Sequence, residues 1–169
     1  TLSTSELINW YPGPMDGDIF WPALCRYWVE KKGWDASIVD SIDQSSTKIV
    51  SRMHPALRPQ ISTRGLVVGH VQSGKTANYT AVIAKAADVN YRIFIVLAGT
   101  TNPLRNQTQA RLQAELCSQN PEHWNLLTSP DEDFHVGYVR NVNAWLAEGN
   151  FKLLGVVKKN AVVLRRLLK

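Results

Sequence analysis

Cysteine is scarce in this sequence, and long apolar runs are absent. The only two cysteines among 169 residues, Cys25 and Cys117, are far apart and in no CxxC or His-bearing spacing. We therefore expect neither a disulfide framework nor a cysteine-based zinc site, and a reducing, cytoplasmic location fits best. The longest apolar run, residues 93–98, is far shorter than the roughly 20 residues of a membrane helix. Residues 1–14 also lack the basic and apolar segments of a secretory signal. No membrane partner is expected.

The composition indicates a globular chain with an uneven charge distribution. Hydrophobic residues make up 44% and charged residues 20% of the chain, enough apolar residues for a core. The net charge is +5, but residues 1–60 are close to neutral and the basic excess lies in residues 61–169. A basic half can contact polyanions, and simple solubility is the alternative explanation.

The sequence divides into two regions near residue 62. In residues 1–62, apolar residues from Ile19 to Trp28 recur at helical spacing, which predicts a helix ending near Gly33. A second short helix is expected after Asp35 and a third over residues 45–53. Two prolines within residues 54–59 predict a linker. Residues 1–62 therefore form a predicted helical N-terminal region.

Residues 63–169 alternate short apolar runs with helical stretches. Strands are expected at residues 66–68, 93–98 and 153–157, and the β-branched run 93–98 is typical of a strand buried on both faces. Helices are expected over residues 76–87, 104–118 and 160–169. This order predicts an α/β fold with an open parallel sheet and right-handed crossovers.

The strongest chemical signal is the segment GHVQSGKT, which matches the phosphate-binding pattern G-x-x-x-x-G-K-[ST]. Backbone amides in such a loop, with the N-terminus of the following helix, cradle phosphate groups. Lys75 would bridge the β- and γ-phosphates of ATP, and the Thr76 hydroxyl would ligate Mg²⁺. The predicted ATP-binding residues are Gly69, His70, Val71, Gln72, Ser73, Gly74, Lys75 and Thr76.

Residues 64–112 also resemble the Z-one domain family. The resemblance is carried by VQSGKTAN, IAKAAD, and LAG followed by LR-x-QTQ-x-RL. It extends upstream over RYWVEKKGW and SIDQSSTKIVSRMHP and downstream over VVKKNAVVLRRLL, so that it covers about residues 18–169 and weakens over 119–150. Members of this family are bacterial helicase-like ATPases of superfamily two, labelled endonucleases and found near restriction or phage-defence genes. The resemblance therefore implies that residues 63–169 are the first part of a RecA-like P-loop NTPase lobe. It also implies ATP hydrolysis coupled to work on DNA, with other defence proteins as partners.

The same resemblance implies nucleic-acid contacts after two of the expected strands. The candidates are Thr100, Thr101, Asn102, Arg105, Gln107, Lys158 and Lys159, with Asn160 beside them. The alternative for the first group is a helix N-terminus capped by polar groups, and for the second a solvated helix entry.

An acidic Mg²⁺-binding strand end, which a motor ATPase needs, is not evident. The cluster Asp131-Glu132-Asp133 follows a proline and polar residues, which favours a solvated loop. In the resembled family the acidic motif comes after the KKN helix, so we expect this chain to be the front part of a larger ATPase and to turn over poorly alone. No residue pattern here predicts a nuclease.

Two other functions remain open at this level. A P-loop kinase or switch NTPase would suit the length of the chain, although no arginine-rich lid is evident. A non-catalytic nucleotide-binding assembly module would use the aromatic N-terminal helices to dock on a partner.

Overall fold

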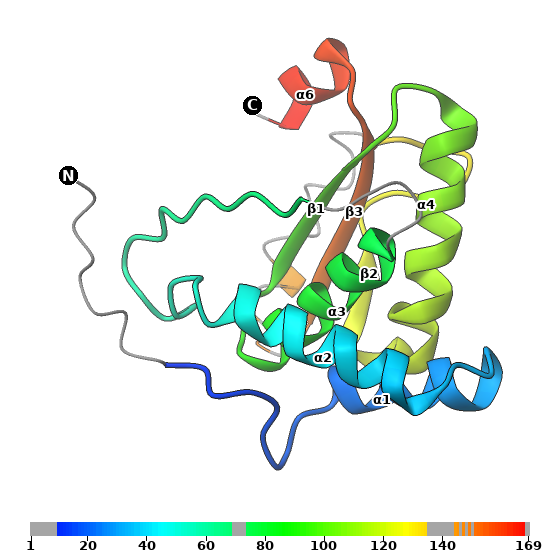
Figure 1. Ribbon diagram of the computed structural model, residues 1–169. Helices are drawn as coiled ribbons and strands as arrows, with labels where there is room; N and C mark the ends of the chain where they lie inside the picture. The colour runs from blue at the N-terminus through cyan, green and yellow to red at the C-terminus, as the bar shows by residue number, and fades with distance from the viewer. Residues whose placement is uncertain are drawn as a thin grey trace. The chain divides into compact units, whose positions relative to one another are not determined.

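The computed structural model describes residues 10–68, 74–134, 144–145, 147, 149 and 151–167 of the chain. The chain separates into two compact units, Thr1–Asn90 and Tyr91–Lys169. The first unit is helical in its described part, and the second combines helices with a three-stranded parallel sheet (Figure 1). The predicted α/β class is confirmed at this level.

The first unit begins with helix α1 (Phe20–Arg26), which continues into the π-helical turn η1 (Tyr27–Lys31). This confirms the helix predicted from the aromatic spacing. Its apolar residues lie on one buried face and are Phe20, Trp21, Leu24 and Trp28. Gly33 follows with φ +65°, a left-handed conformation that glycine adopts without strain and that ends the helix.

Helix α2 (Ala36–Val50) is a single helix, so the two separate helices expected over this stretch are wrong. The Asp35 side chain caps it by accepting a hydrogen bond from the Ser37 backbone N–H at 2.8 Å. The run of polar residues at its centre does not break it, because the Ser46 hydroxyl donates to the Ile42 carbonyl within the helix. Residues 54–59 form turns without helix or strand, as predicted for a linker.

Helix α3 (Lys75–Asp88) confirms the helix predicted after the phosphate-binding motif. Both α1 and α2 pack against it. The buried side of α3 is rich in alanine, and small side chains allow neighbouring helices to approach closely. The buried alanines are Ala77, Ala81, Ala84, Ala86 and Ala87.

The strand expected at residues 66–68 is wrong. This segment has no strand structure, and Leu66 and Val68 are 88% and 85% exposed. A strand is stable only when its backbone groups pair with a neighbour, and no ladder partner for this segment occurs among the described residues. An apolar run alone is therefore not enough to make these residues a strand.

The sheet of the second unit consists of β1 (Ile93–Ala98), β2 (Trp124–Leu126) and β3 (Lys152–Lys158), in the order β1-β3-β2. Both pairings are parallel, with Ile93 beside Leu153 and Trp124 beside Lys152. The strands predicted at 93–98 and 153–157 are confirmed, whereas β2 was not expected. Its three residues include the polar Asn125, which weakens the apolar signal of a strand.

Strand β3 lies between the other two and is buried along almost its whole length. The prediction that β1 is buried on both faces is wrong, because one of its faces is open to solvent. Its alternate side chains Ile93, Ile95 and Leu97 are 50%, 38% and 51% exposed. On the same face of β3, Leu153 and Val157 are covered by a cluster that includes Phe134 and Val163.

Two helices confirm predictions in the second unit, with small shifts at their ends. Helix α4 (Asn102–Glu115) packs against β1 and β3, and α6 (Ala161–Leu167) follows β3 (Figure 1). The short 3-10 turns η2 (Cys117–Gln119) and η3 (Pro121–His123) connect α4 to β2. Within the described part of the chain, no helix has the length and apolar character needed to cross a membrane.

Candidate functional site

The junction between the phosphate-binding motif and α3 lies in the first unit. Gly69, His70, Val71, Gln72 and Ser73 are outside the described residues. Gly74 precedes the helix with φ 74° and ψ 14°, a left-handed conformation that favours glycine, and its carbonyl accepts from the Asn78 N–H. Lys75 and Thr76 form the first turn of α3, and the Lys75 side chain is exposed. The helix therefore starts at the lysine of the motif.

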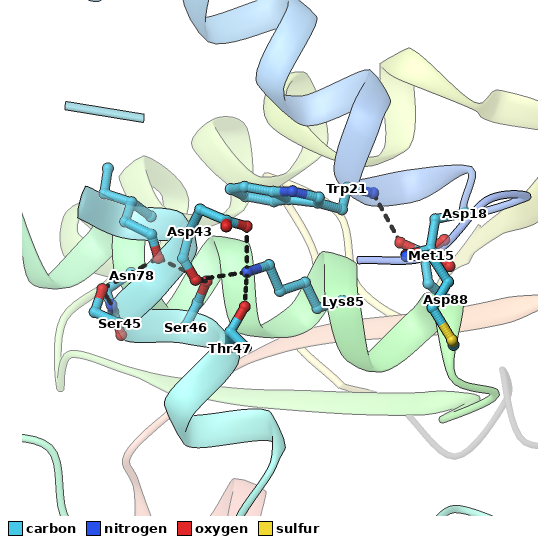
Figure 2. Close-up of polar contacts among 11 residues, drawn as sticks. Met15, Asp18, Trp21, Asp43, Ser45, Ser46, Thr47, Asn78, Lys85 and Asp88 are labelled. Carbon is cyan, nitrogen blue, oxygen red and sulfur yellow. Dashed lines mark hydrogen bonds and ion pairs between the residues drawn. The ribbon is translucent and has the colours of Figure 1, made fainter. Parts of the chain in front are cut away.

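Helix α3 is held to α2 by a buried lysine near its other end. Figure 2 shows the Lys85 ammonium reaching across to α2, where it donates to the Asp43 carboxylate, the Asp43 carbonyl and the Thr47 hydroxyl, each at 2.7 Å. The ring of Trp21 lies over the same nitrogen, 4.3 Å from its centroid. Burial lowers the pKa of Lys85, and the contact with Asp43 opposes that effect. All three hydrogens of the ammonium are thus used.

Helix α3 is also tied to the start of α1. The Asp88 carboxylate accepts hydrogen bonds from the backbone N–H groups of Ile19, Phe20 and Trp21 at 2.7–2.9 Å. Figure 2 shows the contact with Trp21. Burial raises the pKa of Asp88, and the three N–H donors partly offset that rise. A residue at the end of one helix therefore caps the beginning of another.

One contact between α2 and α3 lies in the first turn after Lys75 and Thr76. The Asn78 amide donates to the Ser45 hydroxyl at 2.6 Å (Figure 2). Together with Lys85 and Asp88, this gives α3 polar ties along its length to the two N-terminal helices. The motif lysine therefore projects from a helix whose position is set by α1 and α2.

A second group of predicted residues gathers at the carboxyl edge of the parallel sheet, in the second unit. Ligands of open α/β sheets bind at this edge. A cavity of about 270 Å³ lies here between the first turn of α4, the loop after β2 and the end of β3. It is lined by Asn102, Arg105, Asn106, Pro130, Asp131, Asp133 and Lys158.

Three of the predicted nucleic-acid contacts, Asn102, Arg105 and Lys158, therefore line one cavity. The side chains of Thr100, Thr101 and Lys159 are exposed at the same strand ends but do not line it, and the exposed Gln107 lies further along α4. Thr101 stands at the N-cap of α4 without a side-chain capping bond. Asn160 caps α6 by accepting from the Val162 N–H at 2.8 Å.

Arg105 has a different environment from the one predicted for a nucleic-acid contact. Its side chain is 2% exposed, and its guanidinium nitrogens donate to backbone carbonyl groups and to the Asn106 side chain. The carbonyls belong to Ser129, Pro130, Glu132 and Val156, at 2.6–3.5 Å. Arg105 thereby holds the loop after β2 against the end of β3. Among the described residues its Nε–H, which is buried, has no acceptor.

Thr128 ends the pairing of β2 with β3. Leu127 still donates its backbone N–H to Leu154, but one residue later the Val156 N–H donates to the Thr128 hydroxyl at 2.8 Å. That hydroxyl donates in turn to Gln109 on the buried side of α4 at 2.7 Å. The chain therefore leaves the sheet at Thr128, just before the loop residues Pro130, Asp131 and Asp133 that line the cavity.

The structure separates Asp131, Glu132 and Asp133, which the sequence predicts to form one solvated loop. Asp131 and Glu132 are exposed, whereas Asp133 is largely buried and lies 3.8 Å from the Lys158 ammonium. The Asp133 carboxylate also accepts from the backbone N–H groups of Phe134 and Lys158, at 2.8 and 3.4 Å. No signal in the sequence pairs Asp133 with Lys158, because the two residues meet only through the sheet.

The described residues contain no group of three or more His, Cys, Asp and Glu side chains that could hold a metal ion. Thr76 as a Mg²⁺ ligand stays a prediction.

No protein-family model, curated protein or solved structure matches this chain.

Proposed function

We propose that this chain is the ATP-binding portion of a helicase-like, nucleic-acid-dependent ATPase, with Mg²⁺ as the metal and DNA as the polyanion. The observation that carries the proposal is the Gly74-Lys75-Thr76 junction. A left-handed glycine is followed by an exposed lysine and a threonine in the first turn of a 14-residue helix. The N–H groups at such a helix start favour phosphate, and the lysine adds a positive charge.

The carboxyl edge of the sheet supports the nucleic-acid part of the proposal. Thr100, Thr101, Asn102 and Lys159 are exposed there, and hydroxyl, amide and ammonium groups are the usual donors to backbone phosphates. The resemblance to the Z-one domain family adds the expectation that DNA is the substrate in a restriction or phage-defence setting. The remainder of a larger ATPase and other defence proteins are then the expected partners.

Binding of a fluorescent ATP analogue, with and without Mg²⁺, tests the nucleotide part. Lys75→Ala is expected to weaken binding about ten- to hundredfold, the range of one hydrogen bond to a charged group. Lys31→Ala removes another exposed lysine of the first unit and serves as the control. Equal affinities for the wild type and Lys75→Ala would remove the basis for a P-loop assignment.

Two glycines allow a sharper comparison. Gly74 and Gly33 both have left-handed φ angles, +74° and +65°, and a Cβ at either would meet no atom within 4 Å. Alanine should therefore cost each about 1 kcal/mol of backbone strain. Only Gly74→Ala is expected to weaken nucleotide binding as well, because only that Cβ would stand where the phosphate approaches. Equal nucleotide affinities of the two variants would count against the proposed loop.

A further inference from the structure

The cavity at the carboxyl edge contains both cationic and anionic side chains. Lys158 and Arg105 supply positive charge, and Asp131 and Asp133 supply negative charge. Arg105 is bonded to carbonyl oxygens and to the Asn106 side chain, and none of the ion pairs among the described residues joins it to a carboxylate. Its buried Nε–H has no acceptor in the same part of the chain. The cavity therefore contains a buried cation with unused hydrogen-bonding capacity.

Lys158 is engaged by an acid of its own chain. Its ammonium lies 3.8 Å from Asp133, with the two side chains 25% and 15% exposed. Asp133 is held in place by the N–H groups of Phe134 and Lys158, so its carboxylate stays at the end of β3. At 3.8 Å the two groups are too far apart for a close hydrogen bond, and the part of Lys158 that is open to water lets a phosphate compete with Asp133 for the ammonium.

We propose that Asp133 restrains DNA binding at this edge by competing with a backbone phosphate for Lys158. This inference rests on the proposed nucleic-acid function and adds a control to it. While Lys158 pairs with Asp133, the cavity offers less positive charge to a polyanion. A phosphate in contact with Lys158 would lie beside Arg105, and that contact is gained when Asp133 no longer holds Lys158. Asp133 is thus a residue that sets the affinity and salt dependence of binding.

Asp131 provides a matched control. It lines the same cavity and carries the same charge, but it is exposed, and no hydrogen bond or ion pair of the described residues involves it. Asp131→Asn and Asp133→Asn therefore change the net charge equally. Only the second change releases Lys158.

The experiment measures binding of a short fluorescein-labelled single-stranded DNA, and of its duplex, over a series of salt concentrations. Asp133→Asn is expected to bind about three- to tenfold more tightly than the wild type at low salt, as expected when a like charge is removed and a cation is freed. Its plot of log affinity against log salt should steepen by about 0.9 for duplex and about 0.7 for single strands, the value for one added phosphate contact. Asp131→Asn should gain less affinity and keep the wild-type slope.

The double variant Asp133→Asn/Lys158→Gln tests whether the gain passes through Lys158. We expect it to gain over Lys158→Gln no more affinity than Asp131→Asn gains over the wild type. The inference is overturned if Asp133→Asn matches Asp131→Asn, or if the part of its gain that exceeds that of Asp131→Asn persists without Lys158. If the wild-type chain and Asp133→Asn bind no DNA at low salt, the proposed nucleic-acid function falls and the inference falls with it.

Thermal melting of each variant establishes that it is folded. In Asp133→Asn, the amide oxygen of the substituted side chain can still accept one backbone N–H. If this variant melts early, Asp133→Ser replaces it, because a serine hydroxyl can also accept from a nearby N–H. The same expected and contrary results apply to that variant.

Discussion

The Lys85 ammonium lies 2.7 Å from the Asp43 carboxylate, and the two partners differ in burial. The Lys85 side chain is 0% exposed and that of Asp43 is 34% exposed. Loss of the acid would leave a buried ammonium without its counter-charge, whereas loss of the lysine would leave a carboxylate that water can reach. Removing Asp43 should therefore reduce the free energy of unfolding more than removing the charge of Lys85.

Asp43→Ala is expected to destabilise the first unit by about 2–4 kcal/mol, toward the range for breaking a buried ion pair. Lys85→Met keeps an unbranched apolar side chain and removes the charge, so we expect a loss of about 1–2 kcal/mol. Urea unfolding measures both, and Asp40→Ala, on an exposed position of α2, is the control. A larger loss for Lys85→Met than for Asp43→Ala would contradict this asymmetry.

Asp88→Ala is expected to loosen the start of α1. The change removes the acceptor of three backbone N–H groups, and loss of a helix cap costs about 1–2 kcal/mol. Hydrogen exchange of the Ile19, Phe20 and Trp21 amides should accelerate more than that of amides in the middle of α2. Asp16→Ala, on an exposed turn before α1, should leave these rates unchanged. Unchanged exchange in Asp88→Ala would show that the capping contact contributes nothing.

Local sequence signals predicted most helices and the two longer strands correctly, for identifiable reasons. The spacing of Phe20, Leu24 and Trp28 marks one helical face, and the β-branched run 93–98 marks a strand. The same signals failed where contacts with a distant segment of the chain determine the secondary structure. Residues 66–68 have the composition of a strand but no strand to pair with among the described residues. Helix α2 continues through its serines, because the Ser46 hydroxyl bonds within the helix and Ser45 accepts from Asn78 of α3.

In the candidate site, too, features set by adjacent residues could be predicted and features set by distant contacts could not. The start of α3 at Lys75 could be predicted, because the motif and the helix are adjacent in the sequence. The roles of Arg105 and Asp133 could not. Arg105 binds carbonyls that lie 24–51 residues further along the chain, and Asp133 meets Lys158 across 25 residues. Such contacts depend on strand order, and the short β2 gave no signal for it.

Arg105→Lys is expected to destabilise the second unit by about 2–3 kcal/mol. A lysine has three donors on one atom and cannot span the carbonyls of Ser129, Pro130 and Val156 as the planar guanidinium does. Gln107→Ala, on an exposed position of the same helix, should change stability by less than about 0.5 kcal/mol. Urea unfolding followed by hydrogen exchange of the β3 amides, which belong to the second unit, measures both. A wild-type midpoint for Arg105→Lys would mean that the carbonyl contacts do not anchor the loop.

Cys117 is expected to make the second unit less stable in alkaline solution. Burial raises the pKa of its thiol from 9.0 to about 12. Above pH 9 the unfolded chain loses this proton while the folded chain keeps it, so the folded state binds more protons and stability falls as the pH rises. The contribution of the buried thiol to the free energy of unfolding is complete below pH 9 and decreases by about 1.4 kcal/mol per pH unit up to about pH 12.

Because lysines and tyrosines titrate in the same range, the measurement is the difference in urea midpoint between the wild type and Cys117→Ala at each pH. That difference should narrow or reverse in favour of Cys117→Ala as the pH rises above 9, and a constant difference would mean that the thiol is not shielded from solvent.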